Sequence, residues 1–194
     1  MVAEQGVRSV SFREVARRAG VSHQAPYHHF GSTQGILRAL AQEGFAGLAD
    51  AMTEAAEAAG DDSLAALSEA GVAYVSFARG HVGHFRVMFQ KTSADVDEPL
   101  APLDEALRTH ATLVRLAEAV VRDGHGHGLT ADMLAQLSWS VVHGFATLLV
   151  EGALANEKPR TARQEANHVR RLVASFAGLL GESKPARRRG RPRS

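Results

Sequence analysis

The side chains best placed for chemistry in this 194-residue sequence are three hydrogen-bonding groups, His23, Gln24 and His28. Each can bond to base edges or phosphates, and glutamine can pair bidentately with adenine in the major groove. Arg13 and Arg17 lie just before them, where arginines can contact the phosphate backbone and set register without reading sequence. The pattern indicates a nucleic-acid interface near the N-terminus.

Two short helices and a longer third one are expected to position these residues. A capping-box spacing over 11–14 opens a helix that ends at Gly20, where a tight turn follows. Ser22 is predicted to N-cap a second helix over 22–29, and a serine opens a third over 32–59. Two short helices joined by a glycine turn beside a longer one describe a helix-turn-helix unit.

Apolar residues occur where such a unit needs a small shared core. Tyr27 can serve both as part of this core and as a phosphate donor, and Pro26 lies in the first turn of its helix, where the missing N–H costs least. The predicted core residues are Phe12, Val15, Ala16, Val21, Tyr27, Phe30, Leu37 and Leu40.

The run SFREVARRAGVSHQAPYHHFGSTQGIL over 11–37 resembles the N-terminal signature of the TetR family of bacterial repressors. The matching positions are Val15–Ala16, Ala19–Gly20–Val21–Ser22, Tyr27, His29–Phe30 and Leu37. Farther along, Trp139, His143 and Gly144 resemble the tryptophan–histidine–glycine signature of one subgroup, and His84–Phe85 with Met88–Phe89 is a weaker echo of the same domain.

The resemblance implies an all-α homodimer that pairs through its last two helices, reads a palindromic operator in double-stranded DNA and is released by a small-molecule inducer. In the family the position of Thr33 usually holds a phosphate-binding lysine. The candidate DNA-binding residues are Arg13, Arg17, Ser22, His23, Gln24, Ala25, Tyr27, His28 and Thr33.

The family's first helix would precede Gly6, and Met1–Gln5 supplies only its end, so a truncated first helix is expected. One alternative is therefore a ligand-binding helical dimer with impaired or lost operator binding. A small helical enzyme using His143 is a third possibility. No Gly-x-Ser-x-Gly element or phosphate-cradling glycine loop supports catalysis, and no catalytic residue or cofactor is predicted.

The rest of the chain is rich in Ala, Leu, Glu and Arg and nearly lacks β-branched alternation, so it is expected to be helical throughout. Ser63 is predicted to cap a helix to about Arg79, and a short helix ends near Lys91. After a loop over 95–99, the remaining helices are expected to end at about Asp123 and to span 130–157 and 160–180, with a loop over 124–128.

Polar side chains form one stripe on the expected helix 130–157, and Trp139 lies one turn before His143. They could be ligand-binding groups in an apolar pocket. Alternatively, Trp139 and His143 satisfy hydrogen bonds in the core or across a dimer. The candidate ligand-binding residues are Phe85, Met88, Phe89, Gln136, Trp139, Ser140, His143 and Thr147, of which the first three also suit a core.

The net charge of +1 combines unlike parts, because residues 1–45 carry +2, residues 46–183 carry −7, and the tail has six basic residues. In that tail, Arg189 and Arg191 resemble the Arg–Gly–Arg–Pro core of an AT-hook, which enters the minor groove of A·T tracts. A non-specific basic tail is the alternative. The predicted domains are 1–45 for DNA binding, 46–181 for ligand binding and dimerisation, and 182–194 as a disordered tail.

Several classes of protein are excluded or disfavoured. The absence of cysteine removes thiolate zinc sites and cysteine nucleophiles. His125 and His127 are too few for a metal site and predict a solvated loop, so no metal is expected. The uncharged stretch 133–150 is long enough to span a membrane, but its polar residues favour a core helix. With no signal peptide at the start, the chain is expected to be cytoplasmic.

Overall fold

The computed structural model describes residues 12–89, 104–154 and 162–180, and every regular element in these ranges is an α-helix. The all-α prediction is confirmed. The helices are α2 (Phe12–Arg18), α3 (Ala25–Phe30), α4 (Thr33–Ala58), α5 (Ser63–Gly80), α6 (Val82–Met88), α7 (Asp104–Arg122), α8 (Ala131–Val150) and α9 (Ala162–Leu179).

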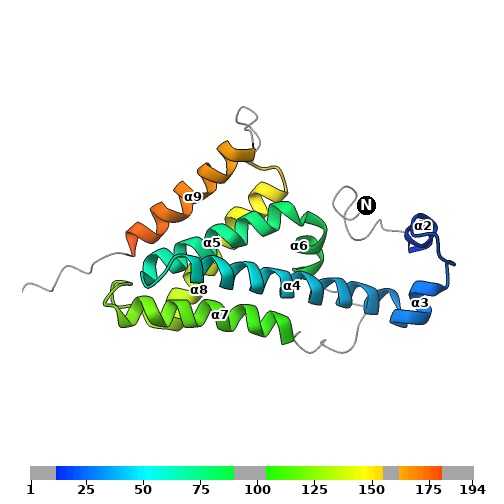
Figure 1. Cartoon of the computed structure of the whole chain (residues 1–194), viewed down its shortest axis with the longest axis horizontal. Helices are drawn as coiled ribbons and strands as arrows, with labels where there is room; N and C mark the ends of the chain where they lie inside the picture. The colour runs from blue at the N-terminus through cyan, green and yellow to red at the C-terminus, as the bar shows by residue number, and fades with distance from the viewer. Residues whose placement is uncertain (1–11, 90–103, 155–161, 181–194) are drawn as a thin grey trace, which may run out of the picture.

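The long helix α4 connects the two parts of the molecule. Figure 1 shows α2 and α3 at its N-terminal end, away from the body in which α5, α6 and α7 pack along the rest of α4. Ser32 starts α4 as predicted, because its hydroxyl accepts a hydrogen bond from the Gly35 N–H at 3.0 Å. The predicted domain boundary after residue 45 falls inside this helix, so both parts share it.

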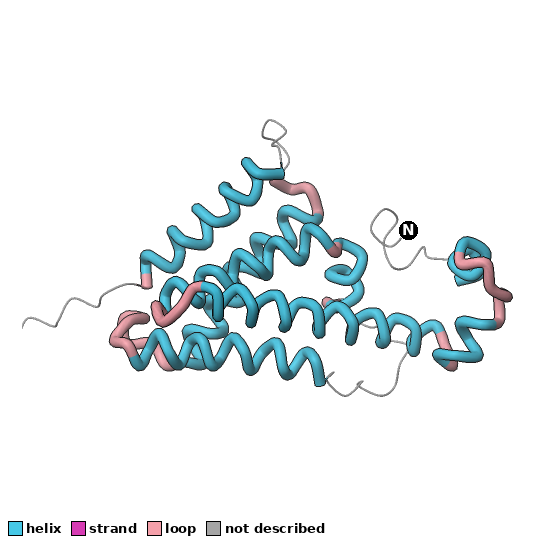
Figure 2. Tube along the Cα trace, viewed as in Figure 1, coloured by secondary structure: helices cyan, strands magenta, loops and turns pink. Residues whose placement is uncertain are grey.

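The core of the body is centred on α5, which packs against α4, α7, α8 and α9. Leu48, Val75, Val120 and Leu134 are fully buried and come from four different helices. At Gly71 the helices approach closely, since a Cβ there would lie 2.9 Å from Val173 and 3.2 Å from Val142. The tube in Figure 2 shows α4 and α5 as an antiparallel pair joined by a short loop.

Two predicted N-caps are wrong. The helix α3 begins at Ala25 after Gln24, and Ser22 contributes only its carbonyl, which accepts from the Ala25 N–H at 3.1 Å. Ser63 is the first residue of α5, and the preceding Asp62 is the cap because its carboxylate accepts from the Ala65 N–H at 3.0 Å. In both cases a neighbouring residue sets where the helix begins.

The helix α8 starts next to the predicted residue 130, where Thr130 is the N-cap, but it ends at Val150, short of the predicted residue 157. Gly152 has φ 75°, and its N–H and that of Ala153 bond back to the carbonyls of Leu149 and Leu148. This pair of bonds is a Schellman motif, which needs the left-handed backbone that glycine adopts without strain.

The loop between α7 and α8 holds the end of α9. The Gly126 N–H donates to the Leu180 carbonyl at 2.8 Å, and His127 Nε2 lies 2.6 Å from the Leu179 carbonyl oxygen. His127 is exposed, as predicted for a solvated loop, and it also contacts the end of α9. The capping box at Ser11, the helix end at Lys91, the loop over 95–99 and the tail lie outside the described residues.

Candidate nucleic-acid interface and ligand cavity

The turn between α2 and α3 brings the predicted base-reading side chains to the start of α3. Gly20 has φ 70°, and the Val21 N–H closes the turn on the Ala16 carbonyl at 3.0 Å. The N-terminal residues of a recognition helix are those that meet base edges in the major groove. His23 and Gln24 directly precede α3 and His28 lies within it, and all three are exposed.

The arginines of α2 are organised around Glu14. Its carboxylate accepts two hydrogen bonds from Arg17, at 2.6 and 2.7 Å, and one from Arg18 at 2.9 Å. These bonds lower the pKa of Glu14 to about 2, so it stays ionised. The Arg17 side chain is still 72% exposed. With Arg13 and His23 it lines a shallow surface hollow, in which Glu14 fixes the orientation of the guanidinium.

Most of the predicted small core of this unit is only partly buried. Ala16 is 1% exposed, whereas Val21, Tyr27 and Phe30 are 49%, 42% and 41% exposed. Among the other candidate DNA-binding residues, Ser22 and Thr33 are exposed and Ala25 is half-buried. Arg189 and Arg191 lie outside the described residues.

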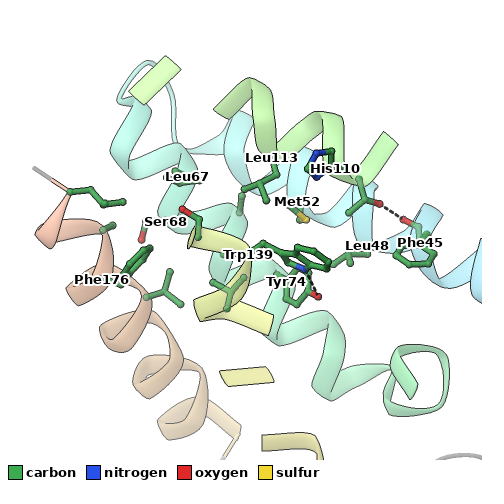
Figure 3. A pocket seen from close by; sticks show the side chains of 18 of the residues that line it. Phe45, Leu48, Met52, Leu67, Ser68, Tyr74, His110, Leu113, Trp139 and Phe176 are labelled. Carbon is green, nitrogen blue, oxygen red and sulfur yellow. Dashed lines mark hydrogen bonds between the residues drawn. The ribbon is translucent and has the colours of Figure 1, made fainter. Parts of the chain in front are cut away.

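A cavity of about 350 Å³ opens inside the body, between α4, α5, α7, α8 and α9. Figure 3 shows its labelled lining residues spread from Phe45 to Phe176 around Trp139 and Tyr74. Its lining residues are Phe45, Leu48, Met52, Leu67, Ser68, Ala70, Gly71, Tyr74, Phe89, Ala106, Thr109, His110, Leu113, Ser138, Trp139, Val142, Val173, Phe176, Ala177 and Leu180. In the part of the chain that the structure describes, the lining is mainly apolar and includes no Asp, Glu, Lys or Arg, which is typical of a site for an apolar small molecule.

Four buried residues in the cavity wall carry hydroxyls: Ser68, Tyr74, Thr109 and Ser138. Thr109 Oγ1 lies 2.8 Å from the Glu105 carbonyl oxygen and 3.2 Å from that of Phe45, so its proton is already used. The Tyr74 hydroxyl is hydrogen-bonded to two side chains. Ser138 is 4% exposed, and its Oγ is buried without a hydrogen-bond partner. Buried hydroxyls are normally satisfied, so the unpartnered Oγ of Ser138 is unusual.

The Tyr74 hydroxyl connects Trp139 to His143 in a hydrogen-bonded chain. It accepts from the Trp139 indole N–H at 3.4 Å and lies 2.8 Å from His143 Nδ1. An indole N–H can only donate, so the Tyr74 oxygen accepts this bond and its own proton is available for an unprotonated His143 Nδ1. Burial lowers the pKa of His143 and raises that of Tyr74, which agrees with a neutral pair. Trp139 and His143 are hydrogen-bonded within the chain, and Trp139 also lines the cavity, so its ligand-binding interpretation stays a prediction.

The predicted ligand-binding residues separate into three groups. Phe89 and Trp139 line the cavity, whereas Phe85 and Met88 are buried in the core and do not line it. The remaining candidates are also outside the lining: His143 lies behind Tyr74, and Gln136, Ser140 and Thr147 share its helix face. The Ser140 hydroxyl donates to the Gln136 carbonyl at 2.7 Å.

Sequence reasoning missed the contributions of α4, α5 and α7 to the cavity, and also Ser138. One available signal was the helical spacing of Leu67, Ala70, Gly71 and Tyr74, which forms a single face. Another was Ser138 itself, a polar residue on the apolar side of its helix. No group of three or more metal-ligating side chains occurs among the described residues.

The geometry is typical of helical transcriptional regulators, in which a helix-turn-helix unit is joined to a helical domain that contains a cavity. Two family profiles agree with this class. The profile described as "Bacterial regulatory proteins, tetR family" matches residues 1–40, and "Tetracyclin repressor-like, C-terminal domain" matches residues 67–176. The chain belongs to the TetR family of DNA-binding transcriptional regulators, which are generally not enzymes.

Similar proteins support the assignment. An uncharacterised HTH-type transcriptional regulator, YobS of Bacillus subtilis (strain 168), is 25% identical over 156 residues, which are 80% of this chain and 76% of YobS. A solved structure of unknown function from Rhodococcus sp. RHA1 has a TM-score of 0.72 at 29% identity, covering 93% of this chain and 90% of its own. The regulator PfmR from Thermus thermophilus shares the fold, with a TM-score of 0.61 at 20% identity and 94% of each chain covered.

Proposed function

We propose that this protein is a cytoplasmic, ligand-released repressor that binds a palindromic operator as a homodimer. The observation that carries the proposal is the continuity of α4. It begins directly after the recognition unit, at the Ser32 cap, and its later residues Phe45, Leu48 and Met52 form a wall of the cavity. A ligand that presses on this wall displaces the helix that carries α3.

Release then follows from a difference in affinity between two states. Thr109 is bonded to the Phe45 carbonyl, so α7 and α4 meet at the cavity edge. A ligand that binds better to one α4 position shifts the population toward it. If that position spaces the two α3 helices wrongly for DNA, ligand binding lowers operator affinity, and operator binding lowers ligand affinity by the same factor.

Exposed apolar faces on α8 and α9 support dimerisation through these two helices. On α8, Met133, Leu137, Val141 and Leu148 are 37–55% exposed, and on α9 Leu172 and Leu179 are exposed as well. By length and composition α8 is the one described helix that could also cross a bilayer, a test that helices of soluble proteins pass as well. A second copy covering these faces explains the exposed leucines without a membrane.

The finer resemblances are part of the same proposal. Trp139, His143 and Gly144 are consistent with the tryptophan–histidine–glycine subgroup, in which Trp139 would meet the ligand and His143 would position Tyr74. The basic tail, with Arg189 and Arg191, would add phosphate contacts and a minor-groove preference.

The test is selection of bound sequences from random duplex DNA by the purified full chain. We expect enrichment of a two-fold symmetric site whose half-sites are about 10 bp, or a multiple of it, apart. Sedimentation of the complex should give two chains per site. Recovery of no sequence above the input pool would contradict operator binding, and an asymmetric site bound by one chain would contradict the dimer.

A ligand-binding dimer without operator affinity is the second candidate. The exposure of Val21, Tyr27 and Phe30 favours it, because a helix-turn-helix unit holds its recognition helix through a small core. Hydrogen exchange distinguishes the two: α2 and α3 amides that exchange as fast as an unfolded chain, with α4 protected, would support this second candidate.

A further inference from the structure

The walls of the cavity disfavour a charged ligand. Among the described residues the lining contains no Asp, Glu, Lys or Arg, and its titratable groups are Tyr74 and His110. Burial raises the pKa of Tyr74, so it is neutral. An ion taken from water into such a site finds no counter-charge, and this costs far more than transferring an uncharged molecule.

The size and shape of the cavity limit the ligand further. A volume of about 350 Å³ is near the lower end for small-molecule sites. Since a water-sized group occupies about 30 Å³, the space holds about 12 non-hydrogen atoms. The lining reaches from Phe45 on α4 to Phe176 on α9, at opposite sides of the labelled set in Figure 3, so an extended molecule fits better than a compact one.

The Ser138 hydroxyl supplies the polar contact. It lies on the cavity wall, its residue is 4% exposed, and its Oγ has no partner. A hydroxyl can donate one hydrogen bond and accept others, so a single hydroxyl or carbonyl on the ligand would satisfy it. The Thr109 and Tyr74 hydroxyls are already bonded within the protein.

We infer that the cavity takes an uncharged, extended and mainly apolar molecule with one hydrogen-bonding group, which bonds to Ser138. Medium-chain alcohols and ketones belong to this class. The inference rests on the proposed function in taking this cavity as the regulatory ligand site.

The experiment uses the full chain and three probes of equal length: 1-decanol, decanoate and decylammonium, at pH 7.5. Trp139 is the single tryptophan of the chain and lines the cavity, so its emission reports binding directly. We expect a saturable change with 1-decanol, and at least tenfold weaker binding of both ions because of their buried charge. Either ion binding as tightly as 1-decanol would overturn the inference.

Ser138→Ala tests the polar contact, and Ser140→Ala on the exposed face of the same helix is the matched control. Losing one hydrogen bond should weaken 1-decanol binding about threefold to tenfold in Ser138→Ala and leave Ser140→Ala unchanged. Without probe, Ser138→Ala should melt no lower than the parent, because it removes an unsatisfied buried hydroxyl. A purely structural serine would lower the melting temperature and leave the affinity alone, which would refute its role.

The same titration separates this inference from the proposed function. If 1-decanol binds through Ser138 but does not lower affinity for the selected DNA site, the ligand class stands and ligand release is wrong. If the chain binds its DNA site but no saturable change with 1-decanol occurs, the ligand class is wrong and operator binding stands.

Discussion

Removing the Tyr74 hydroxyl should destabilise the protein measurably, because two side chains depend on it. In Tyr74→Phe, His143 Nδ1 loses a 2.8 Å partner and the Trp139 N–H loses a longer hydrogen bond of 3.4 Å. A lost hydrogen bond costs about 0.5–1.5 kcal/mol, and more where the abandoned partner is buried. Tyr74 is 2% exposed, but Trp139 is 41% exposed and can bond to water. The expected loss is therefore about 1–2 kcal/mol.

The assay is urea unfolding followed by circular dichroism at equal protein concentration, since dimerisation would couple stability to concentration. For a chain of this length, the expected loss corresponds to a fall in melting temperature of about 2–8 °C. Tyr27→Phe is the control, because the chain has two tyrosines and Tyr27 is 42% exposed. Its effect should stay within about 0.5 kcal/mol. Equal stabilities for Tyr74→Phe and the parent would refute the hydrogen-bonded chain.

Four further outcomes are expected. Burial lowers the folded-state pKa of His143, so as the pH falls the unfolded chain binds a proton at this residue before the folded chain does. The stability that this group contributes is therefore complete above about pH 6.5 and declines below it. His143→Asn should flatten the decline in urea midpoints between about pH 8 and 5.5. Gln24→Ala should lose about 1–3 kcal/mol of specific binding in gel-shift titrations with little change in non-specific affinity, and an unchanged ratio would remove its base-reading role. Deleting Arg187–Ser194 should reduce the salt slope of DNA binding by about 0.9 for each phosphate that the tail no longer neutralises, whereas identical slopes would mean that the tail does not touch phosphate. Asp62→Ala should lower the free energy of unfolding by about 0.5–2 kcal/mol in thermal unfolding, and Ser63→Ala should lower it less. A larger loss in Ser63→Ala would count against Asp62 as the cap.

Local signals in the sequence predicted most of the helices. Ser32, Thr130 and the glycine turns act through hydrogen bonds within a few residues, so their effect can be read without the fold. The helix α3 begins after Gln24 with no side-chain cap at all, whereas the error at Ser63 arose where two polar residues competed for one helix start. Choosing between them requires the backbone angles, as when Asp62 takes the extended conformation that a cap needs.

The cavity was less predictable, because it is made by contacts between distant helices. Helical spacing correctly placed Gln136, Ser140 and His143 on one face, but periodicity alone does not say which face meets the cavity. Tyr74 lies 69 residues before His143, and no local pattern indicates that pairing. The family resemblance pointed to Phe89 and Trp139, which line the cavity, but not to the lining residues on α4, α5 and α7.

The contacts of Gly126 and His127 with the end of α9 also fix the point from which the basic tail starts. Figure 1 places the end of α9 and α3 at opposite ends of the molecule, with α4, about 39 Å long at 1.5 Å per residue, running between them. The 14 residues after Leu180 span at most about 50 Å when fully stretched. The anchored end of α9 therefore sets where the tail begins, at the end of the molecule away from its own recognition helix.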